Sequence, residues 1–148
     1  MSEWRHLAEG AGSNATSGTT YRLPRVTFVA ISVGAVVGAN ARYLVGGWIA
    51  DRFGSGFPLG TLFINVSGSL VIGAFATLAG ERLVIADWWR PLVAIGFLGS
   101  YTTFSTFSFE TLALAQAGSF GLAALNVIAS VAGALGGVYL GTIVARAL

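Results

Sequence analysis

The chain has 148 residues, of which 55% are hydrophobic and 9% are charged, and its formal net charge is +2. Because a soluble domain carries about 25% charged residues, this composition excludes a water-facing surface over most of the molecule and predicts an integral membrane protein. The absence of cysteine excludes disulfides and thiolate metal sites, and the eight scattered arginines form no nucleic-acid-binding patch.

Residues 1–20 are polar and rich in glycine, serine and threonine. This composition predicts a flexible tail. A signal peptide is not expected, because no short apolar core with a cleavage site follows a basic start. The single histidine, His6, lies in this tail and is expected to have no chemical role. Residues 21–148 form the predicted membrane domain.

Four long apolar runs follow, and each is long enough to cross a hydrocarbon core of about 30 Å as a helix. Helices are required because lipid offers no partner for backbone polar groups. The chain is therefore expected to be an all-α, multi-pass protein of the cell membrane. The four predicted transmembrane helices are approximately Val26–Ile49, Leu59–Ala79, Pro91–Ala115 and Phe120–Ala145.

An even number of crossings puts both ends of the chain on the same side of the membrane. Arg52 and Arg42 lie toward the opposite side, whereas five arginines lie near the helix ends on the side of the termini. This excess predicts cytoplasmic termini by the positive-inside rule. The five residues are Arg22, Arg25, Arg82, Arg90 and Arg146.

Polar residues within the runs are informative because they are costly in lipid. Arg42 is the only cation within the first run, and Glu110 is the only acid within the four runs. In the second run, Thr61, Asn65 and Ser69 are spaced i, i+4 and i+8, so they share one helix face. Two interpretations stay open: a polar pathway with a vestibule, or a snorkelling arginine with hydrogen bonds that hold helices together.

The third run contains a tract of hydroxyl and aromatic residues after Gly96 and Gly99. This composition suggests a local break in the helix, whose freed carbonyls must be satisfied by protein, water or an ion. Oxygen-only ligation suits a hard cation such as Na⁺. Phe104 and Phe107 are spaced i, i+3 and project from nearly the same face. A tightly packed helix with serine and threonine hydrogen bonds is the alternative.

The fourth run carries Gly133, Gly137 and Gly141 at four-residue spacing, which predicts a face for close helix packing. Asn126 and Ser130 are spaced i, i+4 near the start of this run. Two interpretations stay open: they extend the polar face of the second run, or they bond to a neighbouring helix.

Three segments together carry a resemblance. The first run has glycines that lead to Arg42-Tyr43, and the second has Gly60-Thr61-Leu62 followed by Asn65 and Gly68. The third has Gly96-Phe97-Leu98-Gly99, then Thr102-Thr103-Phe104-Ser105-Thr106-Phe107-Ser108 and Glu110. In these segments the sequence resembles the Fluc (CrcB) family of fluoride channels, over about Gly34 to Gly141. The third segment is the most specific.

The resemblance implies an antiparallel dimer with two separate fluoride pores at the subunit interface. Residues expected to line the fluoride pore are Asn65, Phe104, Ser105, Phe107, Ser108 and Ser130. A structural Na⁺ at the dimer centre would be held by the backbone carbonyls of Gly99 and Thr102. Residues expected in a polar network or vestibule are Arg42, Thr61, Ser69, Glu110 and Asn126. The family's usual tyrosine early in the fourth run is Asn126 here, and a second hydroxyl of some members is Ala134.

The chemistry of these residues agrees with passive export of fluoride. Fluoride is small and strongly hydrated, so a pore must replace its water shell with donors and still let the ion leave. The Asn65 amide and the hydroxyls are neutral donors, and the rings of Phe104 and Phe107 are positive at their edges.

The distribution of arginines bears on the identity of the dimer partner. An antiparallel homodimer needs one sequence to insert in both orientations, which requires little arginine bias. Here five arginines lie near the helix ends on the side of the termini, and one or two lie toward the opposite side. We therefore expect pairing with a sister subunit of opposite orientation, with self-pairing as the alternative.

Other functions agree less well with these residues. A small multidrug-type exporter needs an acid deep in the first run, where the only charge is Arg42. A scaffold subunit that transports nothing would explain the glycine faces but not the hydroxyl and aromatic tract. An intramembrane enzyme is the least favoured, because the runs contain no histidine and no carboxylate pair.

Overall fold

The computed structural model describes residues 25–81 and 86–148, and no strand is present among them. Four segments are long and apolar enough to cross a membrane, which confirms the predicted all-helical membrane fold. They are α2 (Arg25–Phe53), α3 (Leu59–Glu81), a third span over Pro91–Gln116, and α6 (Phe120–Ala147). The predicted tail with His6, and the arginines Arg22 and Arg82, lie outside the described residues.

The third span consists of three pieces. These are η1 (Pro91–Leu98), which has π-helical hydrogen bonding, the short α4 (Gly99–Tyr101) and α5 (Phe104–Gln116). Pro91 begins the span at a position where its missing N–H costs no helical hydrogen bond. At the other end of the bundle, α2 continues to Phe53 rather than ending at Ile49, because Asp51 and Arg52 extend the helix beyond its apolar part.

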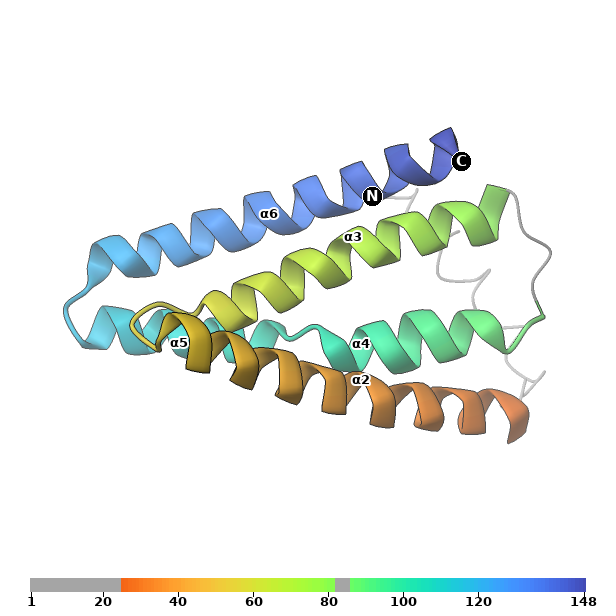
Figure 1. The fold of residues 1–148 in the computed structure, drawn as a ribbon, viewed down its shortest axis with the longest axis horizontal. Helices are drawn as coiled ribbons and strands as arrows, with labels where there is room; N and C mark the ends of the chain where they lie inside the picture. Colours follow the sequence, from red (N-terminus) through yellow and green to blue (C-terminus); the bar gives the residue numbers. More distant parts are fainter. Residues whose placement is uncertain (1–24, 82–85) are drawn as a thin grey trace, which may run out of the picture.

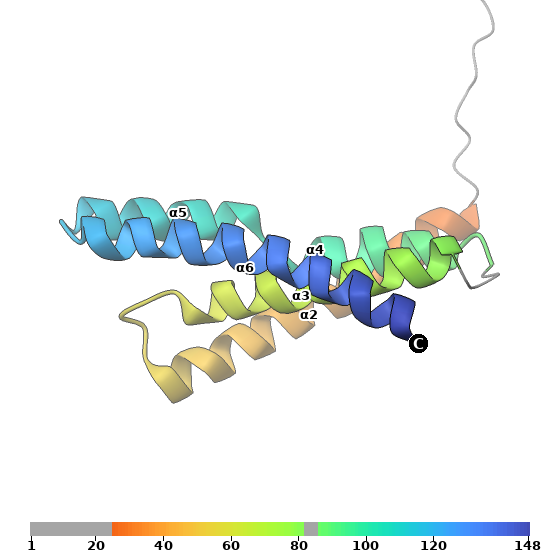
Figure 2. The ribbon, with the colours of Figure 1, turned by 90° about the horizontal axis from the view of Figure 1, so that it is seen from above.

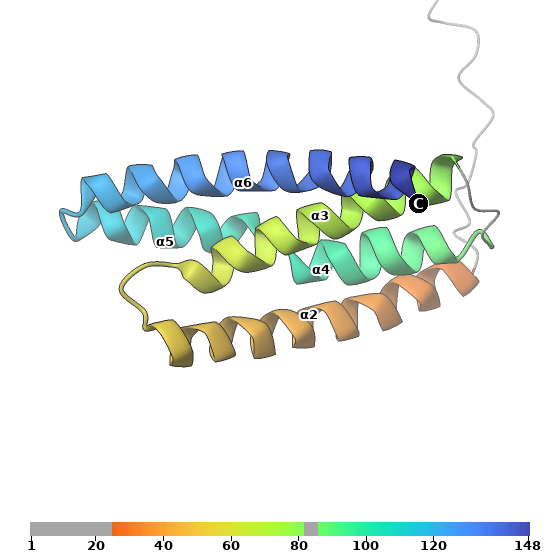
Figure 3. The same ribbon diagram turned by 45° about the horizontal axis from the view of Figure 1, so that its top comes forward.

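The helices run along the length of the molecule, with α3 and α6 side by side (Figure 1). The start of α2 and the C-terminus lie at the same end of the bundle (Figure 1). The two halves of the third span have different neighbours: η1 and α4 pack against α2, whereas α5 packs against α6 (Figure 3). Within the described part of the chain α2 does not pack against α5, and Figure 2 shows these two helices diverging toward the loop that joins α2 to α3.

Small residues allow α2 and η1 to approach closely. Gly34 and Gly38 are buried on α2, and a Cβ atom at either position would collide with backbone oxygens of η1, those of Leu92 and Phe97. Because backbone atoms cannot move aside as a flexible side chain can, a larger residue at these positions would force the helices apart.

The predicted glycine face of α6 packs against α3. A Cβ atom at Gly141 would collide with the Leu70 carbonyl, and one at Gly137 would lie 2.9 Å from the Val66 carbonyl. At Gly133 a Cβ atom would lie 2.7 Å from the Val66 side chain. The spacing of these glycines therefore predicted a real contact face correctly.

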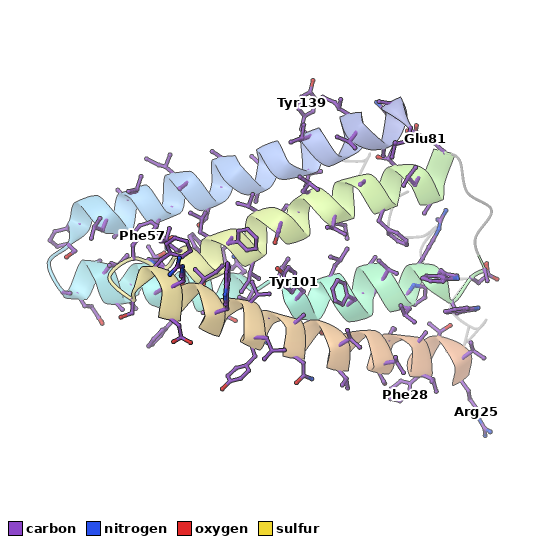
Figure 4. The ribbon with its side chains drawn as sticks, viewed as in Figure 1. Arg25, Phe28, Phe57, Glu81, Tyr101 and Tyr139 are labelled. Atoms are coloured by element: carbon purple, nitrogen blue, oxygen red, sulfur yellow. The ribbon has the colours of Figure 1, made fainter. Side chains whose placement is uncertain are left out.

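The outer faces of the helices are apolar. Phe28 on α2 and Tyr139 on α6 point away from the bundle, whereas Tyr101 lies in its middle (Figure 4). Phe28 is 65% exposed and Tyr139 is 71% exposed, which is the pattern of a surface that faces lipid or another subunit. At the end that holds the C-terminus, Arg146 forms an exposed ion pair with Glu81 at 2.8 Å.

Candidate functional site

The third span is interrupted in the middle of the bundle. The helix α4 ends at Tyr101, and α5 begins at Phe104. Between them Thr102 (φ −77°, ψ 157°) and Thr103 (φ −152°, ψ 112°) have extended backbone. Extended residues cannot continue the helical hydrogen-bond ladder, so their polar groups need other partners in the membrane.

The side chain of Asn65 on α3 supplies two of those partners. Its Nδ2 donates to the Thr103 carbonyl at 3.0 Å, and its Oδ1 accepts from the Thr103 N–H at 2.8 Å. The amide therefore pairs with both backbone groups of one residue. Thr103 in turn is the N-cap of α5, because its Oγ1 accepts from the Thr106 N–H at 3.2 Å.

These bonds divert two backbone donors from their usual acceptors. In an uninterrupted helix the Thr103 N–H would donate to the Gly99 carbonyl, and the Thr106 N–H would donate to the Thr102 carbonyl. Here the first donates to Asn65 Oδ1 and the second to Thr103 Oγ1. The carbonyls of Gly99 and Thr102 thus lose their helical N–H donors, whereas the Leu98 carbonyl accepts from both the N–H and the Oγ1 of Thr102.

Neighbouring residues on α3 and in the third span hold the interruption in place. A Cβ atom at Gly68 would collide with Cγ2 of Thr102, so only glycine leaves room for that side chain. The Tyr101 hydroxyl lies 3.1 Å from Ser67 Oγ, at hydrogen-bond distance. The ring of Tyr101 also stacks on Phe97, with centroids 5.8 Å apart.

A cavity of about 460 Å³, called the central cavity below, lies beside the interruption. It contains most of the residues that the sequence assigned to the pore and the cation site. None of its lining residues is charged. The assigned residues that line it are Asn65, Ser69, Gly99, Thr102, Phe104, Phe107 and Ser130, and Ala134 lines it as well.

The two phenylalanines lie against each other in the wall of the central cavity. Their ring centroids are 5.4 Å apart and the rings are tilted by 47°. Phe107 is only 8% exposed, whereas Phe104 is 78% exposed. One side of the cavity wall is therefore uncovered in a single chain.

Ser105 and Ser108 do not line the central cavity. On the helix that begins at Phe104, Ser105 projects from a different face than Phe107, whereas Ser108 lies one turn after Phe104 and bonds back to its own helix. Both are exposed: Ser108 Oγ donates to the Phe104 carbonyl at 2.9 Å, and Ser105 Oγ lies 3.3 Å from Thr103 Oγ1.

A second cavity of about 650 Å³, called the end cavity below, lies between α2, the α2–α3 loop, α3 and α5. Its lining includes Arg42, Thr61 and Glu110. Thr61 Oγ1 donates to Glu110 Oε1 at 3.0 Å, and Glu110 Oε2 is buried without a hydrogen-bond partner among the described residues. Thr103 lines both cavities, so the paired Asn65 and Thr103 stand where the two cavities meet.

Asn126 lines neither cavity. Its side chain is 1% exposed, and its Nδ2 donates to Thr111 Oγ1 at 2.8 Å. Ser130 Oγ donates to Asn126 Oδ1 at 3.4 Å. Asn126 therefore connects α6 to α5 and reaches the central cavity only through Ser130.

The roles of Thr103 and Thr111 were not predicted from the sequence. A threonine three residues before Thr106, at the start of a helix, is a recognisable N-cap pattern for Thr103. Thr111 has no comparable local pattern, because its partner Asn126 comes from another helix.

The residues at the interruption are suited to a hard cation. Among residues 25–81 and 86–148, no three His, Cys, Asp or Glu side chains lie together as a metal site. The carbonyls of Gly99 and Thr102, whose N–H donors are diverted, belong to residues that line the central cavity. Neutral oxygen ligands of this kind fit Na⁺ and do not fit a transition metal.

Comparisons with known proteins agree on one family. A family model described as "CrcB-like protein, Camphor Resistance (CrcB)" matches residues 29–142. The chain is 47% identical over 123 residues to the fluoride-specific ion channel FluC of Roseiflexus sp., which covers 83% of this chain and 99% of that protein. It is 49% identical over 118 residues to the protein of the same name from Rhodospirillum rubrum, with 78% of this chain and 92% of that protein covered.

Proposed function

The chain belongs to the CrcB family, and from this membership and the neutral polar cavity of its third span we propose that it is a fluoride-specific channel. It is a multi-pass protein of the cell membrane, and its activity is transport rather than catalysis. The proposed channel lets fluoride leave the cell down its gradient and so lowers cytoplasmic fluoride.

The observation that carries this proposal is the composition of the central cavity. Its wall combines an amide, hydroxyls and two aromatic rings with no fixed charge. Neutral donors can replace part of the water shell of fluoride without trapping the anion, and the ring edges of Phe104 and Phe107 add weak positive potential. The second Nδ2 hydrogen of Asn65 is not used by the bond to Thr103, so it is a donor in this wall.

A second subunit is part of the proposed channel. Phe104 lines the central cavity and is nevertheless 78% exposed, so a single chain leaves the proposed ion path open on one side. An ion next to lipid tails is very costly, and a partner surface would close that side. The partner is a second copy or a sister subunit in the opposite orientation, and the arginine excess near the termini favours the sister subunit.

A structural Na⁺ is also part of the proposal. The carbonyls of Gly99 and Thr102 would hold it, together with the same atoms of the partner subunit. When bound, the cation supplies a fixed positive charge near the anion path and a link between two interrupted helices. In this chain, the N–H groups of Thr103 and Thr106 bond to side chains, which leaves these carbonyls available.

The test is fluoride efflux from liposomes that contain the purified protein, measured with a fluoride electrode beside chloride efflux. We expect rapid fluoride efflux with little chloride efflux. Phe107→Ile should lower fluoride efflux about a hundredfold, because it removes a ring edge from the anion path. Phe28→Ile is the matched control, since Phe28 points away from the bundle (Figure 4). Equal chloride and fluoride efflux would contradict the selectivity, and an unchanged rate in Phe107→Ile would remove Phe107 from the pathway.

A further inference from the structure

The amide of Asn65 is committed to the backbone of the third span. Both of its polar atoms bond to Thr103, at 3.0 Å and 2.8 Å. One of the two Nδ2 hydrogens and one lone pair of Oδ1 are therefore used inside the protein. A residue that only lined an ion path would have no need for this pairing, so Asn65 has a second task.

The side chain of Thr103 likewise accepts a backbone N–H, from a residue one helical turn later. Its side chain is buried at 7% exposure, and its Oγ1 accepts the Thr106 N–H while donating to Thr106 Oγ1 at 2.9 Å. Each of the two residues takes a backbone N–H whose helical acceptor would be a carbonyl in the interruption or in the short helix α4 before it. Those two acceptors are Gly99 and Thr102, which both line the central cavity.

We propose that Asn65 and Thr103 are positioning residues for the cation: by accepting the N–H groups of Thr103 and Thr106, they keep the carbonyls of Gly99 and Thr102 free to bind Na⁺. Without an acceptor at Thr103 Oγ1 or Asn65 Oδ1, an N–H group buried in the membrane must find another oxygen. The nearest helical acceptors are the same two carbonyls, so the helix tends to close over its own cation ligands. The inference rests on the Na⁺ site of the proposed function, and it does not depend on how fast fluoride passes.

The pairing also explains why the interruption has a defined length. The Leu98 carbonyl, before the interruption, accepts two bonds from Thr102, and the Thr103 carbonyl, after it, accepts from Asn65. The carbonyls at both boundaries are satisfied by protein groups. The carbonyls of Gly99 and Thr102 lie between these boundaries. They offer an ion neutral oxygens, so no charged ligand is needed in the centre of the membrane.

The test uses the Na⁺ dependence of stability, a property separate from fluoride efflux. The purified protein is unfolded thermally in detergent while Na⁺ replaces N-methyl-D-glucamine at constant ionic strength. A ligand that binds the folded state raises the unfolding midpoint with its concentration. We expect this rise for the natural chain. In Thr103→Val, which keeps the shape but loses the acceptor, the Na⁺ concentration needed for half of the rise should increase about tenfold or more.

Three further variants make the test specific. Thr103→Ser keeps the oxygen and should restore the natural Na⁺ response. Asn65→Leu removes the other acceptor and should weaken the response as Thr103→Val does. Thr77→Val is the matched control, because Thr77 is a buried threonine of α3 whose hydroxyl bonds within its own helix, at 2.8 Å from the Gly73 carbonyl. If Thr103→Val does not yield folded protein, Asn65→Leu and Thr103→Ser still give the comparison.

The outcomes separate this inference from the proposed function. A natural Na⁺ response in both Thr103→Val and Asn65→Leu would overturn the positioning role and leave the channel proposal intact. A natural chain whose midpoint ignores Na⁺, but which still conducts fluoride, would remove the cation site and this inference together. Loss of the Na⁺ response in the Thr77→Val control would show that removing any buried threonine hydroxyl weakens Na⁺ binding. That result would also overturn the positioning role.

Discussion

The central cavity and the end cavity share one wall of α3 but differ in charge. The central cavity is lined by neutral groups only, whereas the end cavity contains Arg42 and Glu110. The central cavity is also the smaller of the two, about 460 Å³ against about 650 Å³. Thr61, one turn before Asn65 on the same face of α3, belongs to the end cavity, so the change from charged to neutral occurs over a single helical turn.

This difference indicates a division of tasks along one path. A charge is cheapest where water reaches it, and the end cavity lies beside the loop that joins α2 to α3. A cation there concentrates anions from solution, which affects how often an ion arrives. In the centre no charged side chain lines the path, so neutral donors remove the water shell of the anion and let it leave.

The largest expected effect comes from filling one cavity and not the other. Ala134→Phe places a ring in the central cavity and should lower fluoride efflux about a hundredfold, because the ring would occupy part of the proposed anion path. Ala113→Phe places the same ring at the edge of the end cavity and should change efflux less than about threefold. Liposome efflux with both variants, after size-exclusion chromatography has shown equal assembly, checks this. The reverse order of effects would break the assignment of tasks.

A middle-sized effect is expected from the charge of the end cavity. Arg42→Gln should lower fluoride efflux roughly threefold to tenfold at low ionic strength and hardly at all at high ionic strength, because salt screens a cation that acts over distance. Arg25→Gln, which changes a charge at the other end of α2, is the control. If the loss in Arg42→Gln is the same at every salt concentration, Arg42 contacts the ion directly and the two cavities are less different than their charges suggest.

The smallest expected effect concerns a polar contact that belongs to neither cavity. The bond between Asn126 and Thr111 should contribute about 0.6 kcal/mol to the free energy of unfolding, the average for hydrogen bonds between membrane helices. A double-mutant cycle with Asn126→Leu and Thr111→Val, measured by unfolding in mixed micelles, gives this coupling. A coupling energy near zero would mean that Asn126 is buried without stabilising the contact of α5 with α6.

The fold followed from the sequence because each span is defined by its own apolar length. The glycine face of α6 also followed, since helical spacing decides which residues share a face. Asn65, Phe107 and Ser130 line one cavity, which agrees with the polar helix face predicted for α3 and with the family resemblance. These features depend on local pattern or on a specific motif.

Other features depend on where the third span changes neighbours, which no local pattern contains. Thr61 shares a helix face with Asn65 and yet lines another cavity. The reason is that η1 and α4 pack against α2, whereas α5 does not. Ser105 and Ser108 are hydroxyl residues of the same motif as Phe107, but the helix that starts at Phe104 turns them away. The double pairing of Asn65 with Thr103 links residues 38 positions apart, and only the packed structure brings them together.

The pairing of α3 with the interrupted third span has a consequence for how the chain enters the membrane. The third span is the least apolar of the four, and its two extended threonines carry backbone groups that lipid cannot satisfy. Asn65, which pairs with both backbone groups of Thr103, is synthesised earlier in the chain. The helix that carries this partner is therefore made before the segment that needs it, and we expect α3 and the third span to enter the bilayer as a pair.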